Sequence, residues 1–339
     1  MNVTLYSEGC RSLIEYLTME QVGISLDERR RILTELFEDP DLSKWLEAYA
    51  SFIPDVRRIT FDLMLNLDAP LSDKGSSSFF EIQRHGFLSA REEGRECMMQ
   101  KLSRAEAMDY EGMEETVDRY LPPNTPLDLD IYLTIDGFNG GMFRERSVFL
   151  SILGVDPEAL SIRGLAHEAH HAGVLYWFKR NERWRRWMSE GGPRLLGAEL
   201  LIYLVAEGLA NHLITPRAVS LVERPRSERE EGHNSRVQML EENYTRLVTS
   251  IEDIVKKALN GELDAAREEF KEFSMDQSGV GLPTGHFASA RMVAEILNEH
   301  GESIIVDLIE NPWMLFAVYN DLTEKTHNFS REVVDFYSG

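Results

Sequence analysis

Cysteine is scarce in this sequence. Only Cys10 and Cys97 are present, far apart and outside any CxxC arrangement. Two such residues do not form the disulfide framework of a small secreted protein, and they do not supply the clustered thiolates of a structural zinc site. The scarcity fits a reducing compartment, and we expect a cytoplasmic protein.

Positive charge is also in short supply. Lys and Arg total 36 against 58 Asp and Glu, which gives a formal net charge of −22. A chain with this balance is repelled by nucleic-acid backbones and by anionic membrane surfaces. We therefore expect neither nucleic acid nor a membrane among its partners.

Long hydrophobic runs are missing as well. The strongest run, residues 200–206, is much shorter than the ~20 residues that a membrane-spanning helix needs. Residues 1–17 contain Glu8, Arg11 and Glu15, where an export signal would need an uninterrupted apolar stretch. Both observations predict a soluble, intracellular chain.

The organisation along the chain changes near residue 120. Residues 10–120 show the apolar spacing of successive amphipathic helices, and a proline-rich break follows at residues 122–126. The segments 130–135 and 147–152 have the composition of short strands. We predict a mainly helical α+β fold, with an N-terminal helical region at 1–120 packed on a core domain at 121–339.

Two long helices are predicted in the core domain. Asp156 can cap the first and Pro157 can occupy its first position, and this helix should reach about Phe178. A turn at residues 191–193 introduces the second helix, which should end before Pro216. The charged stretch 223–236 is expected to be an exposed loop or a frayed segment, and helices are expected around a glycine-rich loop at 279–285.

The first of these helices carries the sequence HEAHH at residues 167–171, which contains HExxH. His167 and His171 share one helical face and can converge on one zinc ion. Glu168 can then take a proton from the attacking water. Two histidines and an acid also occur by chance on solvated helices, so the motif alone is suggestive. His170 points away from the pair. We expect it either to be exposed to solvent or to lie behind the ligands, in contact with a ligand residue and not with the metal.

A third ligand is needed, and Glu207 is the best candidate. It follows the apolar run 200–206 in a helix that should be buried, where an ionised carboxylate is costly unless it is paired or binds a metal. The alternatives are a buried ion pair with an arginine and a helix whose N-terminal boundary differs from the predicted one. Glu199 is a competing acid, but it precedes the apolar run and needs no special partner. Asn211 and His212 could orient a ligand histidine, although both also suit an ordinary helix.

Together these residues resemble the gluzincin type of zinc metallopeptidase, in which a glutamate on a following helix completes HExxH. The extended metzincin motif is absent, because Tyr176 and Trp177 occupy the region of its third histidine. HEAHH, the EGLA sequence at 207–210 and the GHF sequence at 285–287 look more closely like a group of little-characterised zinc-dependent peptidases. The resemblance extends over about residues 129–319.

The resemblance implies a zincin-like core, one Zn²⁺ ion held by His167, His171 and Glu207, and a peptide or protein substrate. It also implies strand addition of the substrate to an edge strand, for which 131–135 or 148–152 would serve. His286, expected in a glycine-rich loop, could donate to the developing oxyanion, although a loop or capping histidine would have the same sequence.

We therefore predict a metallopeptidase that cleaves peptide bonds with zinc-activated water and with Glu168 as general base. Two alternatives stay open. The same Lewis-acid chemistry would serve a zinc hydrolase of another amide or ester. A regulatory protein could also bind zinc at these residues without turnover.

Overall fold

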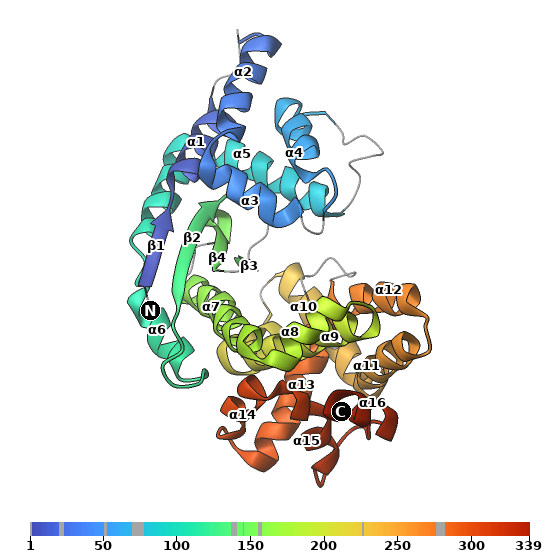
Figure 1. Cartoon of the computed structure of the whole chain (residues 1–339). Coiled ribbons are helices and arrows are strands. Elements are labelled where there is room, and N and C mark those ends of the chain that lie inside the picture. The colour runs from blue at the N-terminus through green and yellow to red at the C-terminus, as the bar shows by residue number, and fades with distance from the viewer. Residues whose placement is uncertain are drawn as a thin grey trace. The chain divides into compact units, whose positions relative to one another are not determined.

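The computed structural model describes residues 2–19, 24–50, 53–69, 78–136, 141–144, 146–154, 158–225, 227–275 and 282–339 (Figure 1). Most of these residues are helical, as predicted. The chain divides into two compact units, and each is described by itself. The first contains Met1–Glu114 and Pro126–Ala169, and the second contains Glu115–Thr125 and His170–Gly339.

The first unit contains the sheet. Strands β1 (Asn2–Tyr6), β2 (Asp128–Thr134) and β4 (Ser147–Ser151) are parallel, whereas β3 (Gly141–Arg144) is antiparallel to β4. The order is β1-β2-β4-β3. The predicted strands are therefore confirmed as β2 and β4, but both are internal. The expectation that one of them forms an edge is wrong, because β1 and β3 form the edges.

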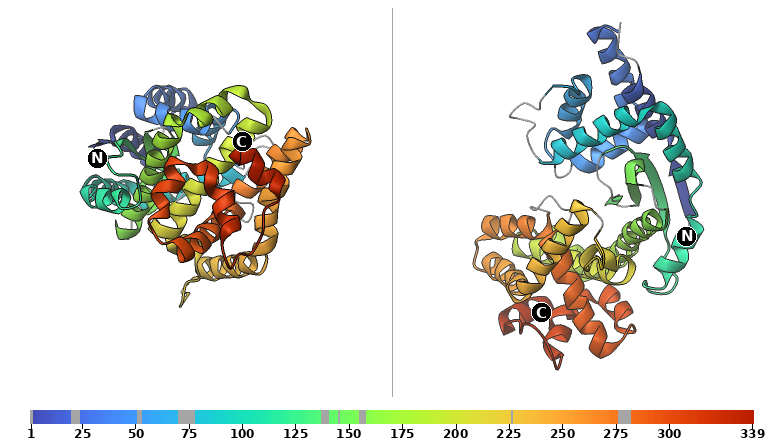
Figure 2. Two further views of the ribbon diagram at one scale, coloured as in Figure 1. Left: turned by 60° about the horizontal axis from the view of Figure 1, so that its bottom comes forward. Right: turned by 180° about the vertical axis from the view of Figure 1, so that it is seen from behind.

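Helices pack around this sheet, and α1 lies along α5 (Figures 1 and 2). Ser25 caps α2, since its side chain accepts a hydrogen bond from the Glu28 N–H at 3.2 Å. Gly94 interrupts α5 with a φ of 81°, a conformation that favours glycine. These helices are α1 (Glu8–Thr18), α2 (Leu26–Phe37), α3 (Pro40–Ala50), α4 (Val56–Leu65) and α5 (Ser78–Glu106), and the 3-10 turn η1 (Ile152–Gly154) follows β4.

The second unit is built around α9 (Gly192–Leu209), the predicted second helix, which packs against α13 (Thr284–His300). A Cβ atom at Gly208 would lie 2.9 Å from the Ser289 carbonyl oxygen, so glycine allows the two backbones to approach closely. Gly192–Ile214 is long and apolar enough, by length and composition alone, to cross a membrane. However, 67% of its most apolar stretch of 18 residues is buried inside the structure. Its apolar side chains therefore form much of the core.

The remaining helices of this unit surround α9. Ser227 caps α10, where an exposed loop was expected, because its side chain accepts from the Glu230 N–H at 3.2 Å. In the last helix, α16, the Tyr337 hydroxyl donates to the Gly197 carbonyl of α9 at 3.1 Å. The elements are α8 (Glu182–Glu190), η2 (Ala210–Ile214), η3 (Pro216–Val219), α10 (Glu228–Glu242), α11 (Tyr244–Leu259), α12 (Leu263–Ser274), α14 (Ile304–Glu310), η4 (Pro312–Met314), α15 (Leu315–Asp321) and α16 (Arg331–Ser338).

Helix α7 (Glu158–Arg180) carries the HEAHH sequence, and α6 (Glu111–Asp118) precedes β2. The expected cap at Asp156 and Pro157 lies outside the described residues. The limit between the compact units falls inside α7, after Ala169. The division into 1–120 and 121–339 stays a prediction, although β1 and β2 bring residues of both segments into one sheet.

Candidate metal centre

The two histidines of HExxH lie one turn apart on α7, as predicted. His167 and His171 are part of one continuous helix, so the helix itself fixes their separation. Each of these imidazoles and the Glu207 carboxylate offers one ligand atom, and the three atoms lie within 4.8 Å of one another. The predicted set of two imidazoles and one carboxylate is therefore brought together.

Glu207 lies between two imidazoles of its own unit. Its Oε1 is 3.3 Å from His171 Nε2, and its Oε2 is 3.4 Å from His286 Nε2. The side chains of His171 and Glu207 are 12% and 16% exposed, so the carboxylate is largely removed from solvent but still accessible. The competing acid, Glu199, instead pairs with Arg267 at 3.4 Å.

Asn211 supports the carboxylate of Glu207 directly. Its Nδ2 donates to Glu207 Oε2 at 2.9 Å and to the Glu207 main-chain oxygen at 2.9 Å. Asn211 is only 2% exposed and lies in η2, a turn of π-helix that continues α9. Such π-turns are frequent at functional sites. Asn211 was expected to contact a ligand histidine, and the structure shows that it contacts Glu207.

His286 lies in the first turn of α13, so its expected position in a loop is wrong. The helix starts close to Tyr203 of α9, and a Cβ atom at Gly285 would lie 2.5 Å from the Tyr203 hydroxyl. The rings of Tyr203 and His286 are 5.8 Å apart at an angle of 38°. Burial, with a smaller contribution from the negative charge of Glu207, raises the pKa of Tyr203. Sequence reasoning missed Tyr203, although its spacing of four residues from Glu207 places both side chains on one face of α9.

The other two histidines considered lie apart from this group. His170 is fully buried, and its Nε2 is 3.2 Å from the Tyr120 main-chain oxygen. Its expected place in solvent is therefore wrong, and the other expectation, a place behind the ligands, stays a prediction. His212 is partly buried, and burial, together with the positive charge of Arg291, lowers its pKa.

Glu168 belongs to the part of α7 that lies in the first unit. Sequence reasoning missed a pair of polar residues in the same unit, Tyr49 and Asp136. The Tyr49 hydroxyl donates to Asp136 Oδ2 at 3.1 Å, and Asp136 is 2% exposed just after β2. Burial is the largest cause of the strongly raised pKa of Tyr49, followed by Asp136 and then by the charge of Glu168. Tyr49 therefore lies within the electrostatic reach of both Asp136 and Glu168.

The family model described as "Putative zinc dependent peptidase (DUF5700)" matches residues 34–328. Because the match covers most of the chain, this protein belongs to that family. The match begins well before residue 129, where the resemblance was expected to begin, so the family extends into the N-terminal helices. Neither a curated protein nor a solved structure matches the chain.

Proposed function

We propose that the protein is a zinc-dependent metallopeptidase of the gluzincin type, with a zincin-like core, that hydrolyses peptide bonds. The observation that carries the proposal is the gathering of ligand atoms from His167, His171 and Glu207 within 4.8 Å, with Glu168 next to the first of them. The family to which the chain belongs supports the choice of metal and of substrate class.

The donor set fits zinc. Catalytic zinc sites commonly have three protein ligands drawn from imidazoles and carboxylates, and their fourth position remains open. The 12% and 16% exposure of His171 and Glu207 leaves access for a small ligand. When bound, a zinc ion polarises the scissile carbonyl and makes a water molecule more acidic.

The protein's own groups would perform the remaining steps. The Glu168 carboxylate takes a proton from the attacking water and delivers it to the leaving nitrogen. Asn211 fixes the orientation of Glu207 through its 2.9 Å hydrogen bond. His286, 3.4 Å from Glu207 Oε2, is proposed to donate a hydrogen bond to the carbonyl oxygen as negative charge develops there.

The substitution Glu168→Gln tests the proposal. Turnover of a peptide library should fall by about 10²–10⁴ because the general base is lost. The zinc content, measured by atomic emission, should be retained, whereas His171→Ala should lose it. Glu199→Gln is the matched control, since Glu199 pairs with Arg267 away from the site. Full turnover by Glu168→Gln would refute the proposed role.

The substrate class needs a separate comparison. The unaltered protein should cleave internally quenched peptides faster than small amides and esters at equal concentration. Preferential cleavage of a small amide or ester would retain the zinc chemistry and overturn the peptidase assignment. Stoichiometric zinc binding without cleavage of any substrate would instead favour a regulatory protein.

A further inference from the structure

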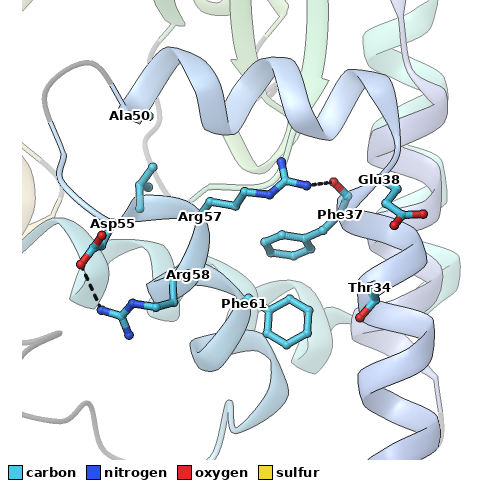
Figure 3. A pocket seen from close by; sticks show the side chains of 9 residues that line it. Thr34, Phe37, Glu38, Ala50, Asp55, Arg57, Arg58 and Phe61 are labelled. Atoms are coloured by element: carbon cyan, nitrogen blue, oxygen red, sulfur yellow. Dashed lines mark hydrogen bonds and ion pairs between the residues drawn. The ribbon is translucent and has the colours of Figure 1, made fainter.

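A pocket of about 500 Å³ lies in the first unit between α2, the end of α3 and α4 (Figure 3). This volume is within the range of about 300–1,000 Å³ that is typical of small-molecule sites. The described residues that line the pocket all lie between positions 34 and 61. It therefore contains none of the residues of the candidate metal centre.

The floor of the pocket is apolar. Phe37 and Val56 are 3% and 1% exposed, and Phe61 remains partly exposed. The rings of Phe37 and Phe61 meet edge to face, with centroids 5.2 Å apart. Aromatic edges and faces of this kind bind another ring or a branched apolar group well.

A guanidinium group lies beside this floor. Arg57 donates to the main-chain oxygen of Phe37 (Figure 3). It also donates to Ser43 Oγ at 3.0 Å, and its guanidinium carbon is 5.7 Å from the centre of the Phe37 ring. These contacts cap the C-terminus of α2 and use two of the five N–H donors of the side chain. Further donors remain for a ligand.

The charges around the pocket differ in how they are compensated. Arg58 pairs with Asp55 and Asp62, each at 3.3 Å. Among the described residues, Arg57 has no carboxylate partner at ion-pair distance, and only the carbonyl end of α2 partly offsets its charge. Glu38 is also on the rim, and because both Glu38 and Arg57 are exposed, solvent screens both charges.

We propose that this pocket binds a carboxylate attached to an apolar, preferably aromatic, body, with the carboxylate on Arg57 and the apolar body on Phe37 and Phe61. Arginine suits this role because its planar donors match a carboxylate. Two sources present this chemistry, namely a free apolar carboxylic acid and the carboxyl terminus of a peptide. The proposal does not depend on hydrolysis at the metal centre.

Binding of N-acetylphenylalanine, measured by titration calorimetry or by NMR, tests the proposal. We expect a dissociation constant of about 1 mM or tighter, as is usual for a ligand of this size. N-acetylphenylalanine amide, which lacks only the charge, and N-acetylglycine, which lacks only the ring, should each bind at least about 10-fold more weakly. Equal binding of the acid and its amide, or no saturable binding of the acid, would overturn the proposal.

Two pairs of variants locate the site. Thr34 is exposed on the rim, so Thr34→Glu should weaken binding of the acid about five-fold relative to Thr34→Gln, which has the same size. Arg57→Gln should abolish binding, whereas Arg217→Gln, at an exposed arginine of η3 outside the pocket, should retain it, and melting curves will show whether each variant is folded. The Thr34 pair keeps the test decisive if Arg57→Gln unfolds, and equal binding by its two members would place the ligand elsewhere.

A further experiment with peptides distinguishes a free carboxylic acid from the carboxyl terminus of a peptide as the ligand. Glu168→Gln protein, chosen to avoid cleavage, is titrated with a tetrapeptide ending in phenylalanine and with its C-terminal amide. Tighter binding of the tetrapeptide than of N-acetylphenylalanine would assign the pocket to chain ends, and the reverse order would assign it to small carboxylic acids. If neither peptide nor acid shows a preference over its amide, Arg57 serves only as the cap of α2.

Discussion

The hydrogen bond from Asn211 to Glu207 should control zinc affinity. Asn211 Nδ2 is 2.9 Å from Glu207 Oε2, and the asparagine is 2% exposed, so water cannot easily replace the amide. A hydrogen bond to a charged group contributes about 1.5–3 kcal/mol, which corresponds to a factor of about 10–100 in affinity. Substitutions of groups that orient metal ligands have effects of the same size.

Asn211→Leu removes the donor with little change of volume, and the zinc dissociation constant is then measured by competition with a chromophoric chelator. We expect an increase of about 10–100-fold. Asn298→Leu is the control, because Asn298 is an exposed asparagine of α13. Melting curves of the zinc-free proteins show whether each variant is folded, so that a misplaced Glu207 carboxylate can be distinguished from an unfolded protein. A folded Asn211→Leu protein whose zinc affinity changes less than about two-fold would refute the reasoning.

Three further predictions concern stability. The Glu252 carboxylate is buried, which raises its pKa, but hydrogen bonds from Lys256, Ser330 and His327 outweigh this effect and lower the pKa to about 2. Its stabilising contribution, about 3 kcal/mol, is therefore present above pH 4.5 and lost as the pH falls towards 2, and acid titration of Glu252→Gln should show a flatter loss of stability. The Tyr203 hydroxyl has no hydrogen-bond partner in the described part of the chain, so Tyr203→Phe should leave urea-unfolding stability equal or higher by about 1 kcal/mol, and a marked loss would show that the hydroxyl is paired. Gly208→Ala should cost about 1–3 kcal/mol, since its Cβ would lie 2.9 Å from a main-chain oxygen, and unchanged chemical denaturation would contradict the close approach of α9 and α13.

The sequence indicated which residues could form the candidate metal centre because they follow helical periodicity. The spacing of four residues places His167 and His171 on one face of any helix, whatever surrounds it. Glu207 was recognisable since an acid in an apolar helix needs a partner. Both inferences depend on local geometry, and the structure brings these three residues together.

The rest depended on long-range contacts. β1 consists of five residues that pair with a strand more than 120 positions later, and its short sequence does not indicate that partner. The edge positions of β1 and β3 follow from the strand order, which no single strand encodes. Tyr49 and Asp136 meet across 87 positions, so neither could be linked to the other by spacing.

The contact of α16 with α9 makes the C-terminus important for the helix that carries Glu207. Tyr337 is fully buried and donates a hydrogen bond to the Gly197 carbonyl, and the ring of the neighbouring Phe336 packs against Trp187 at an angle of 37°, with ring centroids 4.7 Å apart. Removing the final eight residues would expose apolar surface along the beginning of α9. A tag or fluorescent fusion placed directly after α16 therefore needs a flexible spacer, so that α16 keeps its contact with α9.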